Sequence, residues 1–193
     1  MPVLPIYLYG QPVLRKKAKP VRAPSPELVR FAGDMLETMR GARGIGLAAN
    51  QVGDLRRVIV VDISDAGEEY RNLPPLVMVN PAVVASEGMW IMEEGCLSIP
   101  DIRDEVEREE SIRVEYRDLE FRSLQLAADG LLARVILHEI DHLNGVLFLD
   151  HLGTVRQRLL RGRLNKIRRG ETDTAYPVAV LGSGGLIREE AVL

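Results

Sequence analysis

The segment from residue 137 to 145 contains the pattern H-E-x-x-H in a strongly apolar, helical context. Residues four apart share one face of a helix, so His138 and His142 can each present a ring nitrogen to the same metal ion. Glu139 would lie beside that ion, where its carboxylate can take a proton from a water whose pKa the ion has lowered. The alternative is a helix with two partly buried histidines that bind nothing. A third ligand, an oxyanion donor and a substrate groove elsewhere in the chain would favour the metal site.

Cys96 is the best candidate for the third ligand. It is the only cysteine, next to Gly95, and a thiolate binds borderline-soft ions strongly, although a free cysteine is most often an inert core residue. The extended pattern of the metzincin proteases needs a histidine at position 148, where this chain has Phe148. His151 lies beyond the predicted helix stop, and Glu171 lies in a segment with no predicted structure. Both are weaker candidates.

The stretch from Gly44 to Gly53 has almost no side-chain bulk, since glycines and alanines fill most of its first half. Glycine permits backbone angles and close contacts that other residues resist, so an extended ligand can hydrogen-bond to the main chain here. A tight turn packed on a helix would have a similar composition. The stretch lacks the Lys-Ser/Thr ending of a phosphate-binding P-loop.

Length and composition limit the kind of protein that carries these residues. At 193 residues, 46% hydrophobic and 27% charged, the chain is expected to form one domain with one sizeable core. The net charge of -3 argues against a protein that coats nucleic acid or a membrane through its overall field. A single cysteine favours a reducing compartment, and neither a signal peptide nor an apolar membrane span is recognisable. We therefore expect a soluble, cytoplasmic protein, acting as a monomer.

Apolar spacing predicts the elements that must position the candidate residues. Ser25 and Pro26 are a typical start for an amphipathic helix over 26–41. Strands are expected at residues 57–62, 76–79, 82–85, 112–116 and 121–126, with the last two forming a hairpin. Residues 93–100 are interpreted as a turn or a strand end. The helix with the H-E-x-x-H pattern should begin after Asp129 as N-cap, and it should stop at Asn144-Gly145.

A second distinctive helix is predicted at about 154–169, at the end of a single catalytic domain spanning residues 1–170. It is rich in Arg and Lys, has no acidic residue, and carries one apolar stripe, formed by Val155, Leu159, Leu160, Leu164 and Ile167. Its charges are interpreted either as a solvated face or as a surface that docks on RNA. Residues 171–193 are expected to form a loose tail or an added edge strand.

Three separate segments resemble the three motifs of the peptide deformylases of bacterial type. GIGLAANQ at 44–51 resembles the first motif, EGCLS at 94–98 the second and HEIDH at 138–142 the third, in the order of that family and with similar spacing. The resemblance covers about residues 4–165, and three motifs together are far more specific than one. The chain departs from the family pattern at Leu137, where a glutamine is usual, and in the segment after residue 170.

The resemblance implies an α+β fold in which antiparallel or mixed sheets surround a central H-E-x-x-H helix, with further helices near both ends of the chain. It implies Cys96, His138 and His142 as ligands of one divalent ion. Ferrous iron is the physiological ion that the resemblance favours, whereas the donor set would also accept zinc, nickel or cobalt.

The resemblance also implies the remaining roles. Glu139 would be the general base, and the side chain of Gln51 and the backbone N–H of Leu97 would stabilise the oxyanion. The residues that would bind substrate are Ile45, Gly46, Met92, Gly95, Leu131 and Val135. Arg134 falls near the mouth of the methionine pocket, and Arg108 and Asp141 are expected to form a supporting ion pair.

The implied activity is hydrolysis of the formyl group from N-formylmethionine of nascent polypeptides, with release of formate by metal-activated water. The implied partners are formylmethionyl peptides, without any membrane. Contact of the basic helix at about 154–169 with the ribosome and its RNA is a separate prediction from its charge. Two alternatives remain open from the sequence. One is a zincin-type metalloprotease that uses the same histidine pair and glutamate, and the other is a non-catalytic relative that binds formylated chains or ribosomes.

Overall fold

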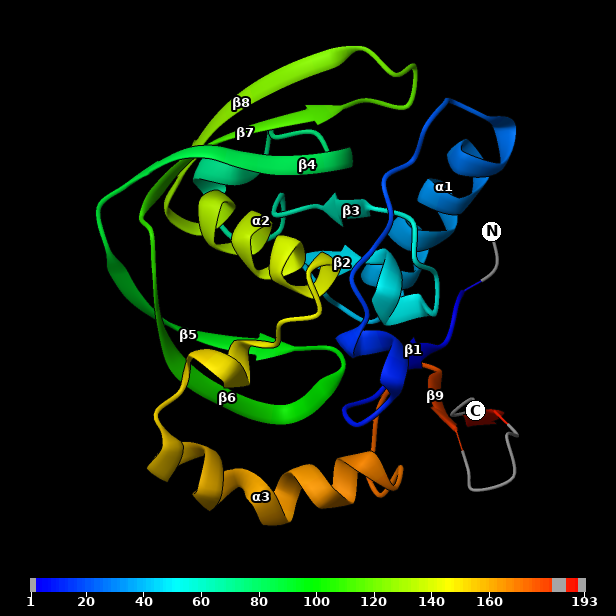
Figure 1. Ribbon diagram of the computed structural model, residues 1–193, viewed down its shortest axis with the longest axis vertical. Coiled ribbons are helices and arrows are strands. Elements are labelled where there is room, and N and C mark those ends of the chain that lie inside the picture. The colour runs from blue at the N-terminus through cyan, green and yellow to red at the C-terminus, as the bar shows by residue number, and fades with distance from the viewer. Residues whose placement is uncertain (1–2, 182–186, 191–193) are drawn as a thin grey trace.

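The helix with the H-E-x-x-H pattern, α2 (Gly130–Leu143), lies between two β-structures in the computed structural model, which describes residues 3–181 and 187–190. A five-stranded sheet covers one side of α2, and a two-stranded hairpin lies on the other side (Figure 1). Helix α1 (Pro26–Gly41) packs against the five-stranded sheet, and α3 (Thr154–Arg168) runs along the outside of the hairpin. The predicted α+β class with a central motif helix is confirmed.

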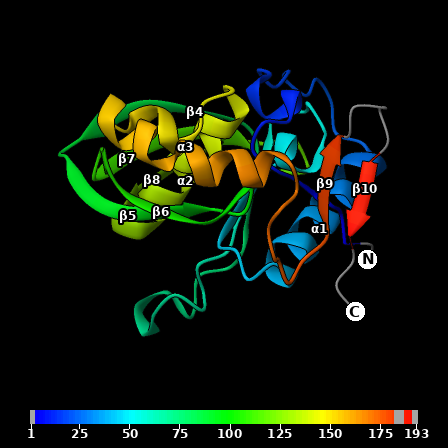
Figure 2. The same cartoon turned by 90° about the horizontal axis from the view of Figure 1, so that it is seen from below.

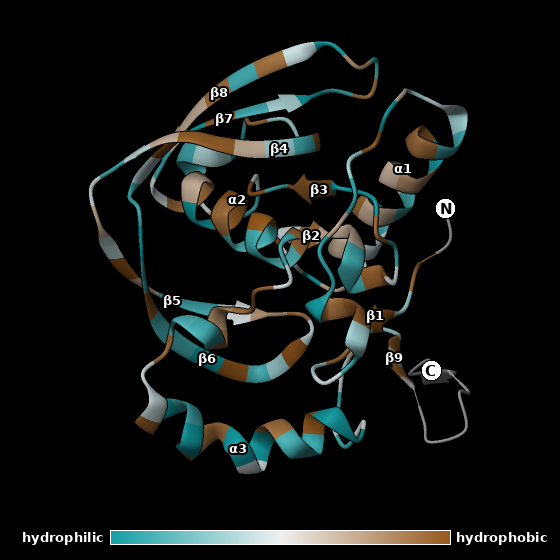
Figure 3. Cartoon of the chain, in the orientation of Figure 1, coloured by the Kyte–Doolittle hydropathy of each residue, from teal (hydrophilic) through white to brown (hydrophobic). Residues whose placement is uncertain are grey.

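The five-stranded sheet has the order β2-β3-β4-β7-β8, and each neighbouring pair in it is antiparallel. Its strands are β2 (Gly46–Ala48), β3 (Val58–Val61), β4 (Leu76–Glu87), β7 (Ser111–Arg117) and β8 (Ser123–Asp129). Every residue of β3 is buried, and Figure 3 shows the strand as uniformly apolar. Strand β2 pairs only with β3, so its other edge faces no further strand among the described residues.

The prediction of two separate strands at 76–79 and 82–85 is wrong, because both belong to β4. The pairing of β4 with β7 shifts register between Val79 and Ala82, and Asn80 adopts a positive φ of 55°. Such an irregularity accommodates Pro81, which has no N–H for the ladder, without ending the strand.

The hairpin beneath α2 consists of β5 (Trp90–Cys96) and β6 (Ile99–Arg108). The sequence indicated only a turn or strand end at 93–100, and it missed most of both strands because many of their residues are charged. Those charges alternate with buried residues such as Ile102 and Val106, which is the period-two pattern of a strand with one exposed face.

The two predicted ends of α2 differ in how they form. Asn144-Gly145 ends the helix as expected, with Gly145 in the left-handed region at φ 77°. Asp129 occupies the N-cap position, but its side chain makes no capping hydrogen bond. In α1, by contrast, the predicted cap is complete, since the hydroxyl of Ser25 accepts from the N–H of Leu28 at 3.1 Å.

Only part of the predicted apolar stripe on α3 is buried. Leu160, Leu164 and Ile167 pack into the core, whereas Val155 and Leu159 are 71% and 70% exposed. A helical stripe through Leu160 and Leu164 passes one turn earlier through position 156, not through 155 or 159. The latter two therefore point away from β6.

Residues after α3 return to the body of the protein. Strand β9 (Val178–Leu181) pairs in parallel with β1 (Ile6–Tyr7) and antiparallel with β10 (Ile187–Glu190), forming a three-stranded sheet. Figure 2 shows β9 and β10 side by side. Of the two alternatives for the tail, an added strand is therefore found at 178–181, but it lies in the centre of this sheet and not at its edge. Residues 182–186 and 191–193 of the predicted tail lie outside the described residues.

Short 3-10 helices complete the described elements: η1 (Pro12–Arg15), η2 (Ala49–Val52), η3 (Glu68–Tyr70) and η4 (Phe148–His151). None of the helices in the described ranges combines the length and the apolar character needed to cross a membrane.

Candidate active site

The predicted ligands come together at the junction of α2 and β5. Cys96 is the last residue of β5, and His138 and His142 lie one helical turn apart on α2. Their ligand atoms all lie within 4.8 Å of one another, and Sγ of Cys96 is 3.2 Å from Nε2 of His142. Within the described part of the chain, this is the one group of three such side chains that could hold a metal ion.

The charge around the histidines suits a cation. His138 is buried, which by itself would lower its pKa, but its contacts with Cys96 and Glu94 raise the pKa well above the ordinary value. Burial and the neighbouring His138 instead lower the pKa of His142. The site therefore favours one positive charge beside Cys96. A divalent ion bound by one thiolate and two neutral imidazoles would supply this net charge.

Glu139 lies beside this group with an unsatisfied oxygen. It is 4% exposed, and its Oε2 has no hydrogen-bond partner among the described residues. Burial raises its pKa to about 7, which is suitable for a group that takes up and releases a proton near neutral pH. Gly46 makes room for it: a Cβ at that position would collide with the Glu139 carboxylate and would lie 2.7 Å from Cγ1 of Val135.

Gln51 points its amide NH₂ at the same site. Its Oε1 accepts the N–H of Ala48 at 2.8 Å, and its Nε2 lies 3.5 Å from Sγ of Cys96 and 3.3 Å from Oγ of Ser98. Because the carbonyl oxygen of the amide is occupied by the main chain, the NH₂ group is the part available to the cavity. Leu97 follows Cys96 in the turn between β5 and β6.

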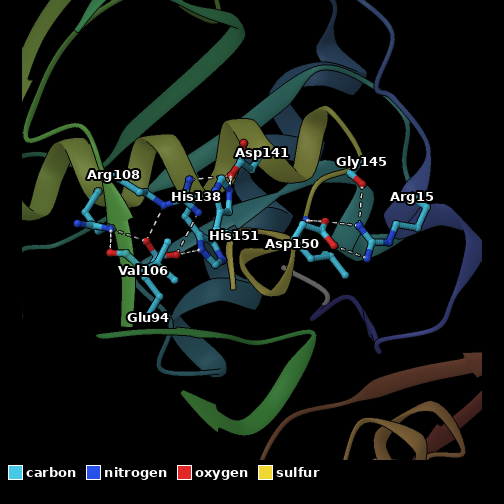
Figure 4. A network of polar contacts seen from close by, with 11 residues as sticks. Arg15, Glu94, Val106, Arg108, His138, Asp141, Gly145, Asp150 and His151 are labelled. Carbon is cyan, nitrogen blue, oxygen red and sulfur yellow. Dashed lines mark hydrogen bonds and ion pairs between the residues drawn. The ribbon is translucent and has the colours of Figure 1, made fainter. Parts of the chain in front are cut away.

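The sequence indicated no role for Glu94, although Glu94 accepts hydrogen bonds from more side chains around the site than any other carboxylate described. Its oxygens accept from Nδ1 of His138 at 2.8 Å, from Arg108 at 2.6 and 3.1 Å, and from Arg134 at 2.9 Å. Figure 4 shows Glu94 beside Arg108 and His138. Burial opposes its ionisation, but the hydrogen bonds from His138 and Arg108 hold the pKa of Glu94 well below its usual range. Bound at Nδ1, His138 leaves Nε2 for the ion.

The expected ion pair between Arg108 and Asp141 is present at 2.7 Å. Asp141 also contacts Nε2 of His151 at 2.7 Å (Figure 4), so His151 supports this network and lies outside the ligand group. Arg134 is buried at 3% exposure and donates to the carbonyl oxygens of Val106 and Trp90. It is thus a buried part of the cavity wall and does not face solvent.

We expect Glu94→Gln to lower the free energy of unfolding by about 3–5 kcal/mol, because it leaves the buried Arg134 without its counter-charge and Arg108 with Asp141 alone. Glu93→Gln is the matched control. Glu93 is the preceding residue on the strand and meets Arg103 at 3.7 Å, with both side chains more than half exposed, so its loss should cost about 1 kcal/mol or less. Urea unfolding of the two variants tests the difference, and equal effects would contradict the structural role of Glu94.

A cavity of about 560 Å³ opens beside the ligand group. It brings together all the predicted substrate-binding residues, namely Ile45, Gly46, Met92, Gly95, Leu131 and Val135. Gln51, Cys96, Leu97, His138 and Glu139 also line it. The edge of β2 opposite β3 borders the same cavity, as required for binding an extended peptide as an added strand. The sequence did not predict that residues 173–176 line the cavity as well.

Comparisons with known proteins agree with this arrangement. The chain matches the sequence profile of the family described as Polypeptide deformylase over residues 3–158. It is 47% identical over 183 residues to the peptide deformylase of Salinibacter ruber, which covers 91% of this chain and 94% of that relative. It is 48% identical over 177 residues to the peptide deformylase of Chlorobium phaeobacteroides, which covers 92% of this chain and 95% of that relative.

Solved structures show the same similarity. The peptide deformylase from Thermus thermophilus has a TM-score of 0.81 at 42% identity, covering 88% of this chain and 99% of that one. The peptide deformylase from Synechococcus elongatus, solved in complex with actinonin, has a TM-score of 0.76 at 43% identity and covers 89% of each chain.

Fold and site together define a hydrolase of the H-E-x-x-H class, in which the third candidate ligand is a cysteine at the end of a strand. The chain belongs to the polypeptide deformylase family. The resemblance seen in the three sequence motifs is thereby confirmed.

Proposed function

We propose that this protein removes the formyl group from the N-formylmethionine of nascent polypeptides and releases formate. Membership of the family and the group formed by Cys96, His138 and His142 support this activity. The observation that carries it is the position of Glu139, a buried carboxylate with a free oxygen, between that group and a cavity bordered by a strand edge.

In this proposal Cys96, His138 and His142 hold one divalent ion. When bound, the ion lowers the pKa of water and polarises the formyl oxygen. Ferrous iron is the proposed physiological ion, and one thiolate with two imidazoles would also accept zinc, nickel or cobalt. Elemental analysis of protein purified without oxygen tests the identity of the ion, since a preparation that is fully active with zinc and free of iron would contradict it.

The chain's own residues would perform the proton transfers and stabilise the developing charge. Glu139 accepts a proton as water attacks the formyl carbon, and it returns this proton to the departing amine when the C–N bond breaks. The negative charge develops on the formyl oxygen, where the NH₂ of Gln51 and the backbone N–H of Leu97 would donate hydrogen bonds. Formate and a free amino terminus are the products.

Substrate would bind as an extra strand along β2. The main chain of Ile45 and Gly46 on one side and of Gly95 on the other would pair with the first residues of the peptide. The methionine side chain would lie among Met92, Leu131 and Val135, which line the cavity next to Glu139. These apolar walls suit a long, unbranched side chain.

Formate release from formyl-Met-Ala-Ser tests the proposal. Turnover of the formylated peptide, without cleavage of an internal bond in an unformylated peptide, is the expected result. Cleavage of internal bonds would instead identify a metalloprotease. A folded, metal-loaded protein that binds the formylated peptide without releasing formate would identify a binding protein.

The proposed partner is the ribosome, which presents the nascent chain, and the proposed compartment is therefore the cytoplasm. We also propose that the protein acts as a monomer. Helix α3 offers the docking surface, with exposed Arg158 and Arg161 that have no ion-pair partner among the described residues.

Charge reversal tests this contact. We expect Arg158→Glu combined with Arg161→Glu to reduce co-sedimentation with ribosomes by about ten-fold or more at moderate salt, because each change replaces an attraction to phosphate by a repulsion. The control pair is Arg22→Glu with Arg113→Glu, two exposed arginines outside α3. Equal binding by both double variants would contradict docking through α3.

A further inference from the structure

The turn that carries Leu97 is held from three directions by residues outside its own hairpin. The hydroxyl of Tyr176 donates to the carbonyl oxygen of Leu97 at 2.8 Å. The backbone N–H of Tyr9 donates to the carbonyl oxygen of Ser98 at 2.8 Å, and Gln51 lies 3.3 Å from the hydroxyl of Ser98. A two-residue turn with these contacts has little freedom to rotate its peptide groups.

Tyr176 reaches this turn because the segment after α3 is tied to β1 at its far end and braced internally near the site. At its far end, the N–H of Ile6 donates to the carbonyl oxygen of Pro177 at 2.9 Å, where β9 joins β1. Closer to the site, the buried Thr174 donates through its hydroxyl to the carbonyl oxygen of Tyr176 at 3.0 Å. The ring of Tyr176 packs against two clusters of buried side chains. One includes Leu160 and Leu164 of α3, and the other includes Met35 and Met39 of α1.

The same segment faces the proposed substrate. Asp173, Thr174, Ala175 and Tyr176 line the cavity that also contains Cys96 and Glu139. The segment therefore leads into the β1-β9-β10 sheet and also forms part of the cavity wall. Its one hydroxyl contact with the β5–β6 turn falls on the residue whose N–H is the proposed oxyanion donor.

We propose that Tyr176 is a positioning residue, whose hydroxyl holds the Leu97 carbonyl and thereby aims the Leu97 N–H at the formyl oxygen. The inference rests on the proposed function. The N–H belongs to the peptide group between Cys96 and Leu97. One end of that group is held through the Cys96 side chain. The other end leads to the Leu97 carbonyl, held by Tyr176, and then to Ser98, held by Tyr9 and Gln51, so loss of the Tyr176 contact releases the support nearest to the Leu97 N–H on that side.

The position of a hydrogen-bond donor matters most in the transition state, where charge has developed on the oxygen. Tyr176→Phe keeps the ring and its packing and removes only the hydroxyl. We expect kcat for formyl-Met-Ala-Ser to fall about ten-fold with KM nearly unchanged, which is less than the about 10²–10³-fold loss typical of deleting a donor itself. Tyr9→Phe is the matched control, because it keeps the backbone N–H that binds Ser98 and removes a hydroxyl that makes no hydrogen bond with the described residues. The Tyr9 ring, like that of Tyr176, packs against the buried cluster that includes Leu160 and Leu164 of α3.

The experiment uses the full-length, zinc-loaded protein and has two readouts. Besides kcat and KM, the exchange rate of the Leu97 amide proton is measured by NMR, and it should increase in Tyr176→Phe and stay unchanged in Tyr9→Phe. Unchanged kcat and unchanged Leu97 exchange in Tyr176→Phe would overturn the proposal. A lower kcat accompanied by faster exchange throughout the domain would also overturn it, because that pattern indicates a purely structural role.

The two hypotheses fail in different ways. If the unaltered protein releases no formate, the proposed function fails, while the Leu97 exchange rate still decides whether Tyr176 holds the turn. If the unaltered protein is active and Tyr176→Phe behaves like Tyr9→Phe, the positioning role fails and the proposed function stands.

Discussion

Glu139→Gln is expected to lower kcat for formate release by about 10²–10⁴-fold, the range over which a positioned general acid–base contributes. Glutamine has nearly the same size, so it should preserve the packing against Gly46 while removing the ability to accept a proton. Steady-state kinetics with formyl-Met-Ala-Ser measures the effect. The control is Glu107→Gln, at an exposed position on β6 outside the cavity.

Metal content must be measured on the same samples, because Glu139 lies beside the candidate ligands but is not one of them. An inactive variant with a full complement of metal supports a role in proton transfer. Robust turnover by the metal-loaded variant would rule out Glu139 as the base, whatever the identity of the ion.

The substitution should also stabilise the metal-free protein at high pH. The pKa of Glu139 is raised from 4.5 to about 7 in the folded state. The folded protein therefore binds this proton more tightly than the unfolded chain, and the resulting stability is complete below about pH 4.5 and is lost as the pH rises through about 7. Thermal unfolding measures the free energy of unfolding of both proteins at pH 5 and at pH 8. From pH 5 to pH 8, the value for Glu139→Gln should rise relative to that of the unaltered protein by at most about 3 kcal/mol. A constant difference would contradict the raised pKa.

Cys96→Ser is expected to abolish stable metal binding. Removing a residue that only hydrogen-bonds to a metal ligand lowers metal affinity by about 10–100-fold, and loss of the ligand itself should lower it further. A serine hydroxyl does not ionise near neutral pH, so the site loses its anionic sulfur donor and retains two neutral imidazoles. Metal content after dialysis measures the loss, and formate release should fall with it.

Ser98→Ala provides the control for Cys96→Ser. It changes a neighbouring residue in the same turn and leaves all three candidate ligands in place, so it should retain the metal. If Cys96→Ser retained stoichiometric metal through dialysis, the assignment of Cys96 as a ligand would be wrong. The fold should survive the change, because Cys96 is only partly buried and serine is of similar size.

Features encoded within a short stretch of sequence were predicted correctly. Helix α1 follows from its Ser25 cap and apolar spacing, and the β7–β8 hairpin follows from alternation. The pairing of His138 with His142 follows from the helical repeat alone. Cys96 was the best candidate for the third ligand because of the chemistry of its thiolate. Gln51 needed the comparison of three motifs with a family pattern, since nothing local indicates that a residue so far before the helix in the sequence lies beside it.

Features that depend on contacts between distant segments were missed. Glu93 and Glu94 are adjacent acidic residues, yet one is exposed and the other is buried between two arginines. The pairing of β5 with β6 decides which of them faces α2, and the sequence did not indicate β6. The exposure of Val155 and Leu159 depends likewise on which face of α3 meets β6.

The sequence by itself determined the chemistry available to this protein: one thiol, a histidine pair at helical spacing, a glutamate beside it and a stretch without bulky side chains. Only the tertiary structure decided how those groups are held. It placed Glu94 behind His138, packed Gly46 against Glu139, and brought Tyr176 to the carbonyl of Leu97 across 79 positions of sequence. The physical reason is that residue types and local periodicity are properties of short segments, whereas support of the site depends on strand register and on contacts that form only when the whole chain has folded.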